Sequence, residues 1–225
     1  MSYILGDIVT RVQKRVRDTG YSAAEIKEYL NDTQNDVFNE YRLPFMETTQ
    51  GYTFTPGVSD ITNGSGLPTN YVQALDLYLT TAGQERVIPY EDIRQVDGYT
   101  PDPDDIVAYP ASTPRAWYVF ARTPRVKPVP DLAYTAILRY YKRPTTLVAA
   151  ADSVVPDLPS EFEELLIVGA AYRVLQAKDN YDQAGVLQNK YDEILQKLVV
   201  KYSQPQVGTP MRVRTNRVSL GKTHF

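Results

Sequence analysis

The chain has 225 residues, a formal charge of −3, a hydrophobic share of 43% and no cysteine. These values are typical of a soluble globular protein, either one large domain or a bundle with an inserted module, and they exclude disulfides and thiolate chemistry. The sequence contains one histidine, His224, which argues against catalysis or metal binding built on histidine. No apolar run approaches the ~20 residues of a membrane span, and no secretory signal opens the chain, so we expect neither.

Two helices are predicted at the start of the chain. Apolar residues recur at spacings of three to five from Ile4 to Val16, which indicates an amphipathic helix. A second helix is expected after Ser22, because Ser22 and Glu25 have the spacing of a capping box, and Pro44 marks its limit. The short break between the two patterns favours an antiparallel helical hairpin.

The pattern changes between residues 47 and 154, where helical spacing disappears and proline and glycine punctuate the chain. Alternating or aromatic runs predict strands of a small antiparallel sheet or sandwich at residues 52–54, 72–79, 116–121 and 134–141. Residues 89–96 are consistent with a short helix, residues 100–105 with a loop, and the Gly64-Ser-Gly66 run with a turn. The 18 tyrosines suit either a sheet that is partly exposed to solvent or surfaces that become interfaces.

Helical patterns return after Asp157. Ser160 and Glu163 have a second capping-box spacing, and residues 162–177 are apolar on almost every side. A helix without a polar face must be buried, so we expect it at the centre of a bundle or at a subunit interface. Gly169-Ala-Ala171 forms a narrow waist that another helix can approach. Asp179-Asn180 then precedes a last helix with an apolar seam at Ala184, Leu187, Tyr191, Ile194, Leu198 and Tyr202.

The expected fold class is therefore α+β, in three parts. Residues 1–46 and 155–203 form an antiparallel bundle of four main helices, and residues 47–154 form a β-rich insertion. Residues 204–225 form an extended basic C-terminal arm with four cations and no acidic side chain. When these four charges are taken from the whole-chain −3, residues 1–203 carry −7. The arm is interpreted as a disordered tail, a nucleic-acid tail or a docking element.

No enzyme motif emerges from the acidic residues. Asp102, Asp104 and Asp105 lie on the expected loop, and Glu163 with Glu164 lies at a helix start. A glycosidase needs two carboxylates in opposing environments, and a calcium loop of the EF type needs a glycine and a distal glutamate that are missing here. We therefore predict no enzyme, no metal and no cofactor. Four arm cations are few for nucleic-acid binding, so contact with DNA would be incidental.

Two helical segments carry a resemblance to a known family. They are Leu158-Pro-Ser-Glu-Phe-Glu-Glu-Leu-Leu-Ile-Val-Gly-Ala-Ala-Tyr-Arg and Tyr181-Asp-Gln-Ala-Gly-Val-Leu-Gln-Asn-Lys-Tyr-Asp-Glu, the second with Ala184 and Tyr191 on its seam. Together with the first hairpin, the β-rich middle and the basic arm, these segments resemble the head-to-tail adaptor (connector) proteins of tailed bacteriophages. The sheet region offers no match at the level of single residues.

The resemblance implies a structural virion protein, assembled in the host cytoplasm and located at the head–tail junction. Such adaptors form a homo-oligomeric ring, commonly of twelve subunits, beneath the portal protein, and the far side of the ring receives a tail or nozzle protein. The implied portal contacts on the arm are Arg212, Arg214, Arg217, Lys222 and Phe225. Three alternatives stay open: another tail-completion or stopper protein, a cytoplasmic protein-interaction module, and an enzyme.

Overall fold

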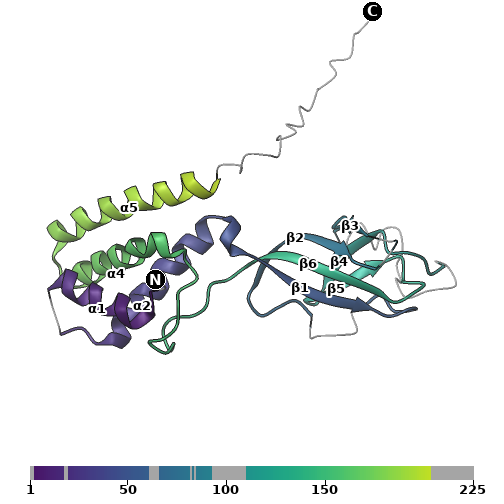
Figure 1. Cartoon of the computed structure of the whole chain (residues 1–225), viewed down its shortest axis with the longest axis horizontal. Helices are drawn as coiled ribbons and strands as arrows, with labels where there is room; N and C mark the ends of the chain where they lie inside the picture. Colours follow the sequence, from purple (N-terminus) through teal and green to yellow (C-terminus); the bar gives the residue numbers. More distant parts are fainter. Residues whose placement is uncertain are drawn as a thin grey trace, which may run out of the picture.

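The structure is a computed structural model that describes residues 3–17, 20–60, 66–81, 83, 85–92 and 110–203 (Figure 1). A helical bundle lies at one end and a β-rich part at the other, so the α+β class expected from the sequence is confirmed. Among the described residues, no helix has both the length and the apolar character required to cross a membrane. The elements are α1 (Leu5–Val16), α2 (Ala23–Glu40), η1 (Pro44–Met46), β1 (Glu47–Phe54), β2 (Tyr71–Leu79), β3 (Arg86–Ile88), β4 (Ala116–Phe120), β5 (Thr123–Lys127), β6 (Tyr134–Lys142), η2 (Ser160–Phe162), α4 (Glu163–Ala177) and α5 (Tyr181–Ser203).

The first two helices form as the sequence predicts. The capping box at the start of α2 is present, since the Glu25 amide donates to Ser22 Oγ at 3.2 Å and the Ser22 amide donates to Glu25 Oε2 at 2.8 Å. The helix ends at Glu40 because Tyr41 is extended, with φ −115° and ψ 151°, before Pro44 opens η1. The buried stripe of α1 consists of Leu5, Ile8, Val9 and Val12.

Helix α4 is the centre of the bundle and packs against α1, α2 and α5 (Figure 1). Its apolar residues are almost completely withdrawn from solvent, as expected for a helix without a polar face. The prediction that this helix lies at the centre of a bundle is confirmed. Eight of its side chains are at most 4% exposed: Leu165, Leu166, Ile167, Val168, Ala170, Ala171, Val174 and Leu175.

The start of α4 differs from the prediction. Ser160 and Glu163 do not form a capping box, because residues 160–162 make a turn of 3₁₀ helix in which the Phe162 amide donates to the Pro159 carbonyl at 2.8 Å. The α-helix begins only at Glu163, with Phe162 as a cap that offers no side-chain hydrogen bond. The Glu163 carboxylate binds Arg11 of α1 instead. Here a tertiary contact overrides a local spacing signal.

The waist at Gly169 is confirmed by the neighbours of this residue. A Cβ atom on Gly169 would lie 2.3 Å from Cγ2 of Thr33 in α2 and 3.0 Å from Cε2 of Tyr191 in α5. Both distances are below an ordinary van der Waals contact, so only glycine fits between these helices. Gly169 thus sets the distance at which α2 and α5 approach α4.

Helix α5 lies along α4 with the seam predicted from the sequence. Asn180 precedes its first turn and accepts a hydrogen bond from the Gln183 amide at 3.4 Å. Ala184, Tyr191 and Leu198 are buried, while the three other seam residues are partly buried against the bundle core. The opposite side of α5 stays exposed, so this helix forms one outer face of the bundle (Figure 1).

The β-rich part has two layers. A four-stranded antiparallel sheet has the order β1-β6-β2-β3, and the β4-β5 hairpin forms a second, two-stranded sheet. Along β6, buried and exposed residues alternate from Tyr134 to Tyr140, which is the pattern of a strand with one face toward a core. The shared core between the layers includes Phe54, Leu77, Leu79, Trp117, Val126 and Leu138.

Two strands were not predicted, for identifiable reasons. Strand β3 has only three residues, too few for an alternating pattern to be read. Strand β5 contains Pro124, and a proline argues against a strand because it has no backbone N–H to donate to a neighbouring strand. The expected short helix at 89–96 is not formed at residues 89–92, where Tyr90 instead makes a parallel bridge with Trp117. Residues 93–96 and the expected loop at 100–105 lie outside the described residues.

Candidate interaction surface of the helical bundle

The arm residues expected to bind the portal lie beyond the described part of the chain. Arg212, Arg214, Arg217, Lys222 and Phe225 all belong to residues 204–225. The structure does describe α5 up to Ser203, the residue that precedes the arm in the chain. A candidate site can therefore be built from the end of α5 and from the surfaces beside this helix.

The end of α5 is firmly attached to the start of α4. The Tyr202 hydroxyl donates to Glu161 Oε1 at 2.7 Å, and Lys201 forms an ion pair with the same carboxylate. The Tyr202 ring contacts the rings of Phe45 and Phe162, with centroids 5.1 and 6.1 Å away. Burial, followed by the bond to Glu161, raises the pKa of Tyr202 to about 12, so this hydroxyl stays protonated as a donor. These contacts fix the position at which the arm begins.

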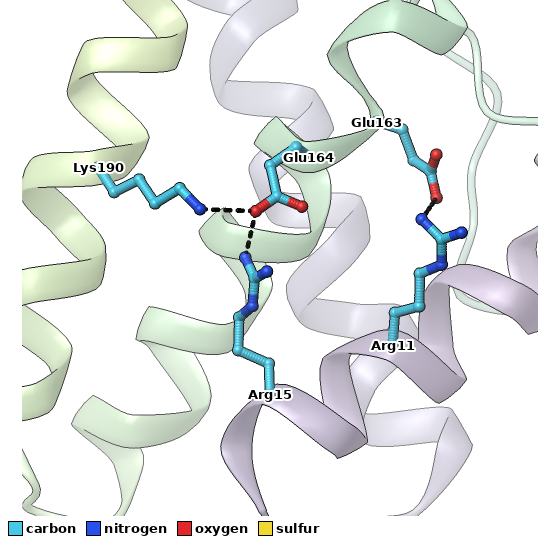
Figure 2. Close-up of polar contacts among 5 residues, drawn as sticks. All are labelled: Arg11, Arg15, Glu163, Glu164 and Lys190. Carbon is cyan, nitrogen blue, oxygen red and sulfur yellow. Dashed lines mark hydrogen bonds and ion pairs between the residues drawn. The ribbon is translucent and has the colours of Figure 1, made fainter.

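Two further glutamates join α4 to its neighbours, as Figure 2 shows. Arg11 of α1 binds Glu163 at 3.0 Å, and Glu164 receives both Arg15 of α1 at 2.5 Å and Lys190 of α5 at 2.8 Å. Glu164 therefore links three helices through one carboxylate. The sequence places these two acidic side chains together at a helix start, and in the structure each is engaged in interhelical ion pairs.

The two carboxylates respond differently to their surroundings. Burial raises the pKa of Glu163, whose side chain is only 8% exposed, and the single cation Arg11 compensates only in part. Burial also acts on Glu164, but the hydrogen bonds from Lys190 and Arg15 outweigh it and hold the pKa below its ordinary value. Glu164 is therefore the more firmly ionised of the two, as its role between three helices requires.

A groove of about 640 Å³ lies on one flank of α5, between this helix and α2. Three acidic side chains line it, and only Asp36 of these has an ion-pair partner among the described residues, namely Arg173. The groove also contains Tyr191, which is 7% exposed and whose hydroxyl makes no hydrogen bond within the described residues. The lining residues are Asp36, Asn39, Glu40, Tyr41, Tyr191, Asp192, Leu195 and Gln196, and we call this the acidic groove.

A second hollow, of about 300 Å³, is lined mainly by cations of α1. We call its lining the cationic face; it consists of Arg11, Lys14, Arg15, Glu164 and Ile167. Lys190 reaches Glu164 on this side, whereas Asp192 lines the acidic groove. Residues two apart on a helix point about 200° apart around its axis. The cationic face and the acidic groove therefore lie on opposite flanks of α5.

The β-rich part has a more apolar hollow of about 440 Å³ over β2, β3 and β4. Trp117 lines it, and its Nε1 atom has no hydrogen-bond partner among the described residues. Leu75, Val87 and Tyr90 also line the hollow and are more than 40% exposed. In the described ranges no group of three or more acidic or histidine side chains could hold a metal ion.

Sequence reasoning missed the acidic groove, although one signal was available. Asp32, Asp36 and Glu40 recur every four residues, which places an acidic stripe along α2. The contribution of Asp192 could not be read in this way, because it depends on how α5 packs beside α2.

A helical bundle with an inserted sheet, interhelical ion pairs at Glu163 and Glu164, and charged hollows between its helices is the architecture of a protein with surfaces suited to interaction. A family model described as SU10 adaptor protein matches residues 3–214. The chain therefore belongs to the SU10 adaptor protein family and is a phage structural adaptor. The match includes Arg212 and Arg214 and ends before Arg217, Lys222 and Phe225. No curated protein matches the chain significantly.

Proposed function

We propose that this adaptor joins the head of a tailed phage to its tail. Twelve copies form a ring beneath the portal protein, and the arm, residues 204–225, docks on the portal. The opposite side of the ring receives the tail or nozzle protein, and packaged DNA is only an incidental contact. The bundle (1–46 and 155–203), the insertion (47–154) and the arm act as three separate parts in this assembly.

The observation that carries the proposal is the family match, which runs from the bundle through the β-rich part into the arm. The charge distribution supports it, because a segment with four cations and no acid leaves a body of −7. Arginine is well suited to such docking, since its guanidinium binds carboxylates through two parallel hydrogen bonds. The contacts of Tyr202 and Lys201 to Glu161 support it as well, because they give the arm a fixed starting point.

Co-sedimentation with portal rings tests the proposal. The full chain is expected to co-sediment, and a chain ending at residue 203 is expected to stay folded by circular dichroism and to lose portal binding. A chain ending at residue 214 separates the part of the arm inside the family match from the part beyond it. Undiminished co-sedimentation of the chain ending at 203 would refute arm docking.

Point variants refine the test. Replacing Arg212 and Arg214 together by glutamine removes two cations inside the family match, and replacing Arg217 and Lys222 removes two beyond it. Each pair is expected to weaken portal binding most at low salt, and the difference from the wild type should shrink at high salt, where ionic contacts are screened. The matched control replaces Lys197 and Arg143, one pair of cations on the body. If this control weakens binding equally, general charge rather than the arm is responsible.

A further inference from the structure

A closed ring requires each subunit to present two different, complementary surfaces, because neighbours meet head to tail. The grooves beside α5 have this property. We propose that the cationic face of one copy, centred on Lys14, docks into the acidic groove of the next copy. The inference rests on the proposed ring and identifies which surfaces join its subunits.

The acidic groove has the chemistry of an unfilled polar site. Glu40 and Asp192 lie exposed and without an ion-pair partner among the described residues. The groove also holds a hydroxyl, that of Tyr191, on a side chain that is 93% buried and makes no hydrogen bond among the described residues. The unpaired carboxylates favour an opposite charge, and the phenol oxygen can accept a hydrogen bond, so the complement of this groove is a cationic donor. A lysine ammonium has three donors and can therefore serve more than one acceptor at a time.

The cationic face offers such a donor. Lys14 is exposed and forms no ion pair in the described part of the chain. Arg11 and Arg15 lie beside it. Arg11 binds Glu163 and also contacts Tyr3, whereas Arg15 binds Glu164 through Nη1 and keeps further guanidinium donors. Their ion pairs also hold the two arginine side chains in place, so less rotamer freedom is lost when a partner docks.

The placement of the two surfaces favours a ring over a symmetric dimer. The contacts of a two-fold dimer are reciprocal, so the dimer could pair the acidic groove with the cationic face only if both surfaces faced the same neighbour. Opposite flanks of α5 instead allow the same contact to repeat from copy to copy.

Charge reversal in the free protein tests the inference. Sedimentation velocity at low salt is expected to show concentration-dependent association of the wild-type chain. Lys14→Glu and Asp192→Lys are each expected to weaken association by about tenfold or more, because like charges then meet. An equimolar mixture of the two variants should recover association with the variants alternating, since every contact between different variants then pairs opposite charges. The matched control is Glu28→Lys, an exposed residue of α2 about 12 Å along the helix from Asp36.

Cross-linking provides a second measurement that does not depend on the strength of association. The chain has no cysteine, so Lys14→Cys and Asp192→Cys introduce single thiols. A mixture of the two is expected to form a disulfide dimer between different variants, in free protein and on portal rings. A mixture of Lys14→Cys with Glu28→Cys is expected to form far less.

Several results would overturn the inference: a wild-type chain that stays monomeric at every concentration in low salt, reversals without effect, or a mixture without recovery. Loss of association on deletion of residues 204–225, with Lys14→Glu harmless, would assign the groove to a neighbour's arm and overturn it as well. Portal docking is tested separately. Portal binding by variants that no longer self-associate would leave the arm proposal intact, whereas self-association without portal binding would defeat only that proposal.

Discussion

Replacing Gly169 by alanine should open the contact between three helices. The added methyl group would lie 2.3 Å from Thr33 Cγ2 and 3.0 Å from Tyr191 Cε2. Since carbon atoms pack comfortably at about 3.5–4.0 Å, the first contact is short by roughly 1.5 Å. Thr33 cannot rotate away without losing two hydrogen bonds, one donated to the Tyr29 carbonyl at 2.7 Å and one accepted from Arg173 at 2.6 Å. The helices must therefore move apart.

The expected cost follows from two opposing terms. Inserting a methyl group into a packed core costs about 1–3 kcal/mol, and the fixed rotamer of Thr33 places this site at the upper end. Alanine favours the helix over glycine by about 1 kcal/mol, which offsets part of the cost. The net destabilisation is therefore about 2 kcal/mol. For a chain of this size, that corresponds to a fall in Tm of roughly 4–8 °C.

Thermal and urea unfolding followed by circular dichroism measure this effect. The control is Gly185→Ala in α5, where no atom lies within 4 Å of the added Cβ, so alanine should stabilise by up to about 1 kcal/mol. Adding Thr33→Ser to Gly169→Ala removes Cγ2, the closest atom, and should recover part of the loss. If Gly169→Ala is as stable as the wild type or gains stability like Gly185→Ala, the reasoning about the waist is refuted.

Three further predictions concern buried charge and backbone strain. Arg11→Met should leave the Glu163 carboxylate buried without its cation, and burial already raises the pKa of this carboxyl. The urea midpoint of the variant should therefore fall most near neutral pH, where the carboxyl is ionised. The deficit should shrink as the pH falls through this raised pKa and the folded state takes up a proton; adding Glu163→Gln should remove the pH dependence. Asp157→Asn should destabilise by about 1–3 kcal/mol near neutral pH. Burial alone would raise the pKa of Asp157, but hydrogen bonds from Lys142 and Thr145 lower it. The stability difference between Asp157→Asn and the wild type should therefore vanish as the pH falls below the ordinary value of 3.8 and through the lowered pKa. A difference that persists in acid would contradict this account. Gly66→Ala should lower Tm more than Gly83→Ala. Both glycines have positive φ, +87° and +77°, but only at Gly66 would the added Cβ meet a backbone carbonyl, at 2.5 Å. Equal decreases in Tm would rule out that contact as the cause.

The two capping-box spacings show how far local sequence reasoning reaches. Ser22 and Glu25 form their box because both partners lie within one turn and, in the part of the chain that the structure describes, no cation binds the Glu25 carboxylate. Ser160 and Glu163 have the same spacing, yet Glu163 binds Arg11, which is 152 residues away in the chain. A capping-box spacing in the sequence reports only the partners available within the same helical turn. The competing cation becomes visible once α1 is packed against α4.

The periodicity of apolar residues determined the four helices, and the lack of a polar face on residues 162–177 determined that α4 is buried. These features follow from the sequence because helix formation and the side that a helix buries depend on neighbours within a few turns. The acidic groove and the cationic face were decided by tertiary structure alone. Asp36 and Asp192 come together because Gly169 lets α2 and α5 approach α4 closely, and the distance between helices remote in the chain is a property of their packing.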